Sequence, residues 1–240
     1  MTILFNKLAI SGQRNTSIAI ACFVISSLTQ SSFSQDTGCQ KLIDAGTAAY
    51  KKHDYNTAEK CFSSAVDNAS GNNKQLSKAL NDLALTLAAQ GKSAEAEAGF
   101  KHALDVKTEM FGPESIELVP TLNNLGRLYS QLADEDKAEK YYSQALAITE
   151  KTNGANHASV AVCLNNLASV YRQERKFEEA KRLLERALCV AESNFGKNSD
   201  AAAIELNNLG KIYEDQGNTE EAKKALCPSF KRKDKNQVKK

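Results

Sequence analysis

Apolar residues recur every three or four positions through most of this chain, which is the spacing of amphipathic helices. One stretch contains two such runs in succession, separated by a short polar segment at residues 133–135. The first run holds Leu122, Leu125, Tyr129 and Leu132, and the second holds Ala138, Tyr142, Ala145 and Ile148. The pattern predicts two helices joined by a tight turn.

The same pair of runs returns along the chain with a step of 42 residues. Leu-Asn-Asn-Leu begins at Leu122, Leu164 and Leu206, Leu-Asn-Asp-Leu begins at Leu80, and the second runs carry Ala96, Ala138, Ala180 and Ala222. A glycine at 112, 154 and 196 separates the units, where a helix end needs a positive φ. We predict a repeat body at residues 35–230, with units at about 38–70, 73–110, 115–152, 157–194 and 199–229.

These residues resemble the tetratricopeptide repeat family, whose signature sets Leu, Gly or Ala, Tyr and Ala at fixed offsets. In one unit the match reads Leu122, Leu125, Gly126, Tyr129, Ala138, Tyr142 and Ala145. The step of 42 and the Leu-Asn-Asn-Leu opening are most similar to the kinesin light chain subgroup. The family's opening Trp is Leu here and its closing Pro is absent. The resemblance implies an all-α fold, a right-handed α-solenoid of about five antiparallel helix pairs.

The resemblance also implies a role for the first helix of each pair, which in the family lines a concave groove and binds extended peptides. Asn is a poor helix former, so Asn pairs inside a helix need an explanation. A carboxamide both donates and accepts, so it can pair with any peptide backbone. The family implies this role above all for the second Asn of each pair. The alternative is an internal ladder, in which one Asn of each pair binds the neighbouring repeat and no ligand. The candidate residues are Asn81, Asp82, Asn123, Asn124, Asn165, Asn166, Asn207 and Asn208.

Basic residues lie one or two helical turns beyond the Asn pairs. Arg127, Arg172 and Lys211 are predicted to make part of the groove basic. Such a surface suits an acidic peptide or a carboxy-terminus, because charge-assisted hydrogen bonds are the strong ones. The alternative is that these cations are only solvated.

Residue patterns for catalysis are missing from the sequence. It contains no phosphate-binding loop, no zinc-protease motif, no serine-hydrolase motif and no Cys/His spacing suited to a metal. We therefore expect no enzyme activity, no cofactor and no metal. Cys163 and Cys189 are candidates for a disulfide, since they fall on antiparallel helices. The alternative is that they are small buried hydrophobic residues.

Charge is distributed unevenly, although 31 basic and 29 acidic residues nearly balance. Residues 1–34 contain two basic residues and no acid, and residues 231–240 contain six basic residues and one acid, so the body between them is acidic. An apolar run at 17–28 followed by small residues is typical of an export signal, with cleavage near Ser34. A retained membrane anchor and an organelle transit peptide are the alternatives. The basic tail is predicted to be disordered, with attraction to a membrane surface or nucleic acid as its weaker alternative.

Together these patterns predict an exported, non-catalytic scaffold, secreted or periplasmic, that binds a protein or peptide in its groove. One alternative is an assembly module that self-associates through its carboxy-terminal repeat, where Pro228 ends the last helix early. Another is an intracellular adaptor similar to kinesin light chain. We expect no nucleic-acid partner and no stable membrane insertion, and the sequence leaves the partner's identity open.

Overall fold

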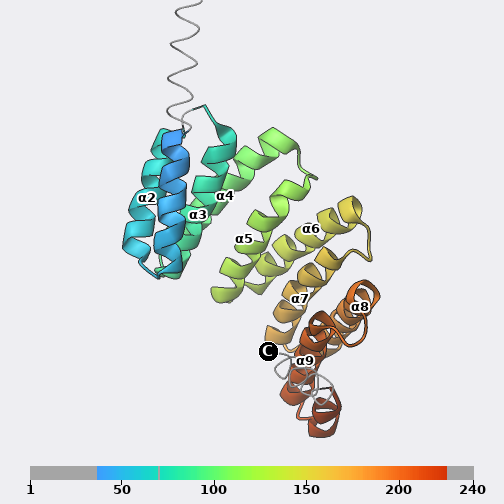
Figure 1. Ribbon diagram of the computed structural model, residues 1–240. Coiled ribbons are helices and arrows are strands. Elements are labelled where there is room, and N and C mark those ends of the chain that lie inside the picture. Colours follow the sequence, from blue (N-terminus) through green and yellow to red (C-terminus); the bar gives the residue numbers. More distant parts are fainter. Residues whose placement is uncertain (1–36, 70, 226–240) are drawn as a thin grey trace, which may run out of the picture. The chain divides into compact units, whose positions relative to one another are not determined.

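The computed structural model describes residues 37–69 and 71–225, and within them every regular element is a helix. Residues 37–51 are helical, followed by α2 (Tyr55–Asn68), α3 (Asn73–Ala89), α4 (Ser93–Phe111), the 3-10 helix η1 (Ile116–Leu118), α5 (Val119–Gln131), α6 (Glu135–Asn153), α7 (Ala158–Gln173), α8 (Phe177–Phe195), α9 (Asp200–Asp215) and helical residues 219–225 (Figure 1). The all-α prediction is confirmed. The predicted export signal and basic tail lie outside these residues.

Two compact units divide the chain, residues 1–86 and 87–240. In the first unit, the helix at residues 37–51, α2 and the start of α3 share one core. That core contains Ile43, Ala58, Phe62, Ala65 and Ala79. No Cβ could be added at Gly46 without approaching the Phe62 ring to 2.7 Å, so glycine lets these two helices come together.

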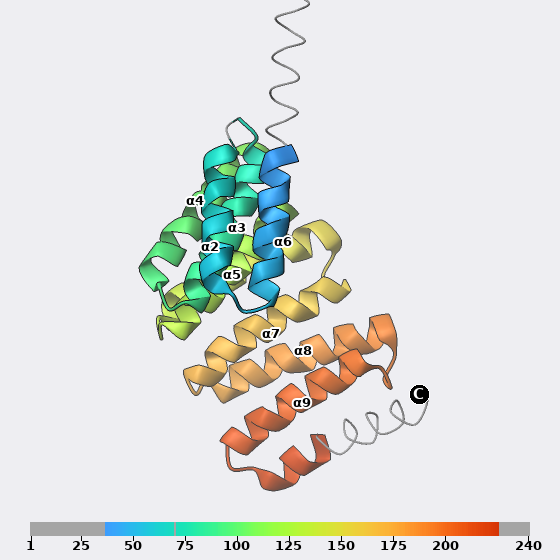
Figure 2. The same ribbon diagram turned by 60° about the vertical axis from the view of Figure 1, so that its left-hand side comes forward.

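The second unit builds the predicted helix pairs (Figure 2). Its first helices α5 and α7 pack against their second helices α6 and α8, and α6 and α8 pack in turn against α7 and α9. The residues that recur at the 42-residue step form the contacts, because they lie on one stripe of each helix. Leu122, Leu125, Ala138, Ala145, Leu164, Ala180 and Ala187 are all fully buried. Leu132 is an exception: it caps α5 and is exposed, although the sequence placed it in the apolar run.

The turn inside each pair has one residue with positive φ at the same repeat position. Gly91, Ala133, Arg175 and Gly217 have φ of +80°, +53°, +62° and +75°. Asp134 then caps α6 by accepting a hydrogen bond from the Lys137 backbone N–H, which satisfies one of the free donors at a helix start. A turn of three residues therefore reverses the chain, even where the left-handed position is not glycine.

The links between pairs contain the predicted glycines. Gly112, Gly154 and Gly196 have φ of +85°, +90° and +86° and end α4, α6 and α8. Each donates its backbone N–H to the carbonyl four residues earlier, at 2.9 Å. The expectation that these glycines adopt positive φ is confirmed. In the part of the chain that the structure describes, no helix is both long and apolar enough to cross a membrane.

Candidate functional site: the face of the first helices

The Asn pairs lie in the middle of the first helices and are all half-buried. Asn123 and Asn124 are on α5, Asn165 and Asn166 on α7, and Asn207 and Asn208 on α9. Asn81 and Asp82 occupy the matching place on α3, where Asn81 Nδ2 donates to Asp82 Oδ1 at 3.4 Å. Asp82 lines a separate hollow in the first unit with Tyr50, Phe62 and Lys78.

Asn side chains form a ladder between successive first helices. Asn166 Nδ2 donates to Asn123 Oδ1 at 3.2 Å, and Asn208 Nδ2 donates to Asn165 Oδ1 at 3.4 Å. In both rungs the second Asn of one pair binds the first Asn of the preceding pair, 43 residues earlier. The internal ladder is therefore present. It uses amide protons of Asn166 and Asn208, and the role of these residues in ligand binding stays a prediction.

A hollow of about 230 Å³ lies between α7 and α9. Its polar lining is Asn165, Ser169, Arg172, Asn208 and Lys211, and its apolar lining is Ala168, Leu184 and Ile212. The structure thus brings four of the predicted residues, Asn165, Arg172, Asn208 and Lys211, to one place. A hollow with an apolar floor and a few converging polar groups is the usual form of a binding site.

This face carries less positive charge than the sequence predicted. Arg172 Nε forms an ion pair with Asp215 Oδ2 across the repeat boundary, and this pair holds the pKa of Asp215 below its ordinary value. Arg127 donates to Asn124 Oδ1 at 3.4 Å. Arg127 and Lys211 are exposed, and no ion pair of either one is found within residues 71–225. Of the three predicted cations, Arg127 and Lys211 are therefore the two without an ion pair among the described residues.

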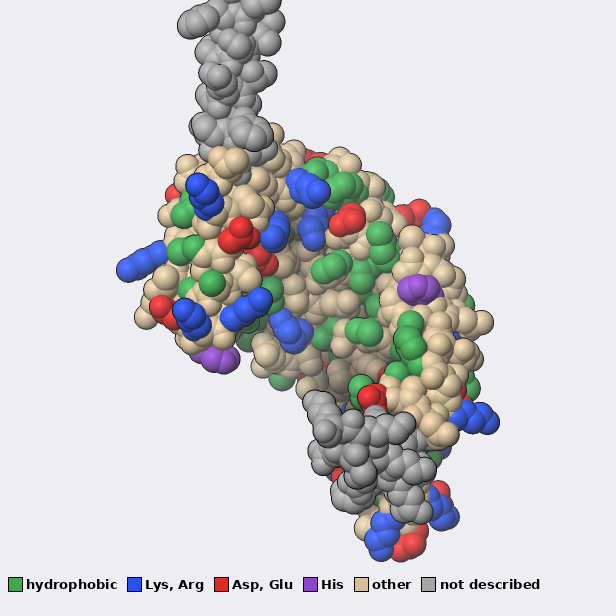
Figure 3. Space-filling model, in the orientation of Figure 1, with side chains coloured by type: hydrophobic (Ala, Val, Ile, Leu, Met, Phe, Trp, Pro, Cys, Tyr) green, Lys and Arg blue, Asp and Glu red, His purple; other side chains and the backbone are tan. Residues whose placement is uncertain are grey.

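Two exposed apolar side chains on the same face were missed by the sequence argument. Val162 and Ile204 are each 57% exposed, one turn before Asn166 and Asn208. Residues four apart share a helix face, so each lies beside its Asn. Their signal was an apolar residue that recurs after 42 residues, with exposed Pro120 at the equivalent place on α5. Figure 3 shows hydrophobic side chains at the surface over α6 to α8.

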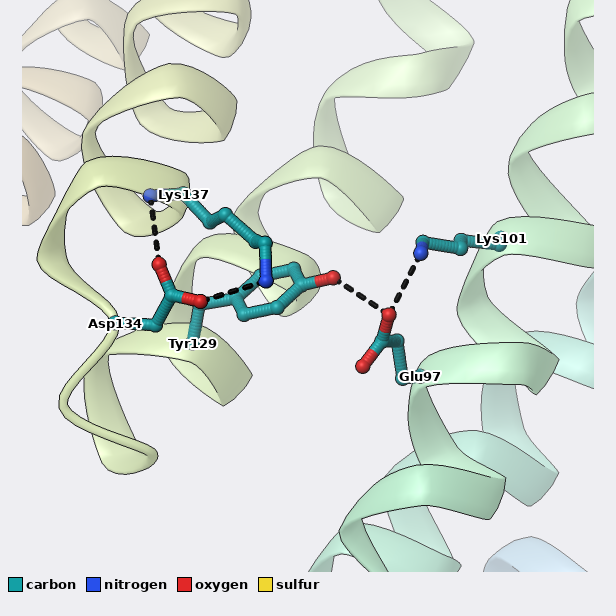
Figure 4. A network of polar contacts seen from close by, with 5 residues as sticks. All are labelled: Glu97, Lys101, Tyr129, Asp134 and Lys137. Carbon is teal, nitrogen blue, oxygen red and sulfur yellow. Dashed lines mark hydrogen bonds and ion pairs between the residues drawn. The ribbon is translucent and has the colours of Figure 1, made fainter.

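At the other end of α5 and of α7, a tyrosine hydroxyl bonds to the preceding second helix, as Figure 4 shows for Tyr129. Tyr129 donates its hydroxyl to Glu97 Oε1 at 2.7 Å, and Tyr171 donates to Glu139 Oε1 at 2.8 Å. Burial, together with the acceptor Glu97, raises the pKa of Tyr129 to about 12. The phenol therefore stays a hydrogen-bond donor at every physiological pH. Lys137 lies over its ring, 4.9 Å from the centroid. This cluster joins α4 to α5.

A polar position recurs where each second helix meets the next first helix. Lys107 Nζ donates to Thr121 Oγ1 at 3.0 Å, and Thr149 Oγ1 lies 3.5 Å from Cys163 Sγ. At the same step, the third junction has Ala191 and Glu205, both buried. Each junction therefore has a different pair of side chains.

The predicted disulfide is not present. Cys163 and Cys189 are both free thiols. Cys163 is buried against α6 beside Thr149, and burial raises the pKa of its thiol, whereas Cys189 is exposed. Cys163 lies on the side of α7 that packs against α6 of the preceding unit, whereas Cys189 lies on α8 and is exposed. Over the described ranges, no group of three His, Cys, Asp or Glu residues could hold a metal ion.

The tetratricopeptide repeat family matches the chain in four overlapping windows, residues 39–109, 75–151, 117–193 and 159–231. The chain belongs to the tetratricopeptide repeat family. Three of the windows begin at residues 75, 117 and 159, which reproduces the 42-residue step. Tetratricopeptide repeats form scaffolds that commonly bind proteins, and the antiparallel pairs described above are their solenoid fold. A comparison with curated protein sequences finds no match.

Solved structures share the tetratricopeptide fold with this chain at low sequence identity. BtubC (BKLC) from P. vanneervenii superimposes with a TM-score of 0.71 and 22% identity, covering 85% of this chain and 90% of that one. A putative kinesin light chain from Podosopora anserina, with nearly identical TPR-like repeats, gives 0.72 and 18%, covering 82% and 96%. PilF from Pseudomonas aeruginosa gives 0.61 and 15%, covering 83% and 78%. At these identities the likeness establishes the fold alone.

Proposed function

We propose that this tetratricopeptide protein is an exported, non-catalytic scaffold that binds an extended segment of a partner protein on the face of α5, α7 and α9. The observation that carries the proposal is the hollow between α7 and α9, where Asn165, Asn208, Arg172 and Lys211 converge over an apolar floor. An extended peptide has unpaired backbone groups, and carboxamides can satisfy them without regard to its sequence.

Charge and exposure on this face indicate which segments fit. Arg127 and Lys211 are exposed cations, and the exposed Val162 and Ile204 lie one turn before Asn166 and Asn208. Apolar ligand side chains would cover the Val and Ile, and acidic ones would approach the cations. Elsewhere on the described body some acids are held in ion pairs, such as Lys151–Glu114 and Arg186–Glu150.

Capture experiments with the full chain as bait test groove binding. Lys211→Glu reverses an exposed charge in the hollow, and the combined change of Asn124, Asn166 and Asn208 to Ala removes the second Asn of three pairs. Lys197→Glu is the matched control, because Lys197 is an exposed lysine in the link after α8. Proteins captured by the wild type should be kept by Lys197→Glu and lost by the groove variants, with helicity by circular dichroism unchanged. Groove binding is wrong if the groove variants keep them.

Export is tested on the protein made in its own cells. Sequencing the amino terminus of the mature protein should show a start near residue 35, because the signal is removed during export. A mature protein that begins at Met1 overturns the export proposal and leaves groove binding intact. In that case an intracellular adaptor role becomes the better account.

A further inference from the structure

Glu205 is a buried carboxylate beneath the last rung of the Asn ladder. Its side chain is on α9 and is only 4% exposed. Glu205 Oε1 accepts a hydrogen bond from Asn165 Nδ2 at 2.8 Å, and Oε2 has no hydrogen-bond partner in the described part of the chain. An ionised carboxylate accepts hydrogen bonds and donates none. Asn165 must therefore turn its amino group toward Glu205.

The orientation of Asn165 sets that of Asn208. With its amino group directed at Glu205, Asn165 offers its oxygen to Asn208, whose Nδ2 donates to it at 3.4 Å. Asn208 consequently uses its amino group inside the ladder. Asn208 also contacts the Glu205 carboxylate, which can accept the second N–H of its amino group. Asn165 and Asn208 both line the hollow, so the group that Asn208 has left for this space is its side-chain oxygen. The chain Glu205–Asn165–Asn208 thus has one direction, set at its buried end.

The preceding rung lacks such an anchor. Asn166 donates to Asn123, and Asn123 in turn contacts the Cys163 thiol, which occupies the same repeat position as Glu205. One repeat earlier that position is Thr121. Thiols and hydroxyls both donate and accept, so they are compatible with either orientation of a carboxamide. Glu205 is the acceptor-only residue among these three positions.

Charged groups around Glu205 do not balance it. Burial raises the pKa of Glu205, the contacts with Asn165 and Asn208 lower it, and among the described residues no charged side chain contributes. On α8, which packs against α9, the register places buried Ala191 nearby, followed by half-buried Glu192. On α7 the facing group is Asn165. Helical residues 219–225 carry the exposed ion pairs Lys223–Glu220 and Lys224–Glu221. The two carboxamides are therefore the groups that stabilise the carboxylate.

We propose that Glu205 is a positioning residue whose ionised carboxylate fixes the direction of the Glu205–Asn165–Asn208 chain, so that Asn208 presents a hydrogen-bond acceptor to the hollow. A ligand must then offer an N–H at this point, as an extended peptide backbone does. This second part rests on the proposed function, whereas the direction of the chain does not. Protonation gives Glu205 a donor of its own and releases the direction, so acid changes what the hollow recognises.

NMR on the full chain without any ligand tests the direction of the chain. Side-chain amides are followed in protein labelled with ¹⁵N-asparagine, each assigned by its loss in an Asn→Ala variant. The amides of Asn165 and Asn208 should shift together as pH is lowered, with one midpoint above the ordinary Glu value of about 4.3. The Asn123 and Asn166 amides provide the internal control and should not follow that midpoint, because Cys163 stays neutral there.

Variants assign the titration to its cause. Glu205→Gln should abolish the shared titration, and Glu192→Gln should keep it. Should Glu205→Gln fail to fold, Glu205→Thr and Glu205→Cys replace it, since Thr121 and Cys163 already occupy this repeat position. The proposal is overturned if Asn165 and Asn208 do not titrate together, or if their titration survives the loss of Glu205. Neither result bears on the capture experiment, so the two proposals fail separately.

Discussion

Asn166 donates a side-chain N–H to Asn123 Oδ1 across a repeat boundary, at 3.2 Å. Both carboxamides are half-buried, so the bond is partly shielded from water. Helix interiors disfavour Asn, and the ladder explains why the pair is present in spite of this.

A double-mutant cycle measures that rung. We expect Asn123→Ala and Asn166→Ala to destabilise the protein singly, with a coupling energy of about 0.5–1.5 kcal/mol, the usual net value of one hydrogen bond. Urea denaturation of the wild type, both single variants and the double variant gives the value. A coupling energy near zero would show that the rung contributes nothing to stability.

Stability should depend on pH through Glu205. Burial raises its pKa in the folded state, so the folded chain holds this proton more tightly than the unfolded chain does. The contribution of Glu205 is therefore fully present below the ordinary Glu pKa of about 4.3 and is lost as pH rises through the raised value.

The variant Glu205→Gln isolates this contribution from other titrating groups. Its free energy of unfolding relative to wild type should rise with pH across that window, by at most about 1.4 kcal/mol per pH unit, and level off above it. Urea denaturation at several pH values checks this. An equal difference between the two proteins at every pH would contradict it.

Gly126 should not tolerate a methyl group. An added Cβ would lie 2.7 Å from the Tyr142 ring, and overpacking of this kind costs about 1–3 kcal/mol. Alanine favours the helix over glycine by about 1 kcal/mol, which offsets only part of the cost of the clash. We expect Gly126→Ala to lower the midpoint of thermal unfolding.

A second change should reverse this loss. One repeat later the same two positions are Ala168 and Leu184, which belong to one core cluster. Gly126→Ala combined with Tyr142→Leu should therefore be more stable than Gly126→Ala alone. If the double variant is the less stable of the two, the contact between α5 and α6 is not the cause.

Replacing Arg175 with glycine should stabilise the protein. It has φ of +62° in the turn between α7 and α8, where side chains other than glycine are strained. Arg175→Gly should raise the free energy of unfolding by about 1 kcal/mol. Gly91→Ala, at the same repeat position with φ of +80°, is the converse control and should lower it. Chemical denaturation of the two variants provides the comparison, and a loss of stability in Arg175→Gly would refute the argument.

Helix positions and the core could be predicted because both follow from one period. The recurring Leu and Ala residues of each unit are buried at the same places, and the glycines of the links have the predicted positive φ. Once one helix pair is recognised, residues 42 positions apart are expected to occupy equivalent places in successive pairs.

Contacts between repeats could not be predicted, because they join residues that a period alone does not pair. Arg172 was predicted to be a free cation, but Asp215 of the following unit neutralises it. Cys163 was matched with the partner helix inside its own unit, but it faces Thr149 of the preceding one. Glu205 occupies a place where earlier units have Thr and Cys, so nothing in the repeat marks it as a buried carboxylate.

The junctions between successive units also make their order specific. Lys107 meets Thr121 at one junction, Thr149 meets Cys163 at the next, and Ala191 stands beside the place of Glu205 at the third. Units so alike in sequence could otherwise exchange places in a misfolded chain. By the repeat register, a unit docked one position too early would set the Glu205 carboxylate against Thr149 rather than against Ala191. We therefore expect the different pairs of side chains to favour one order of the units.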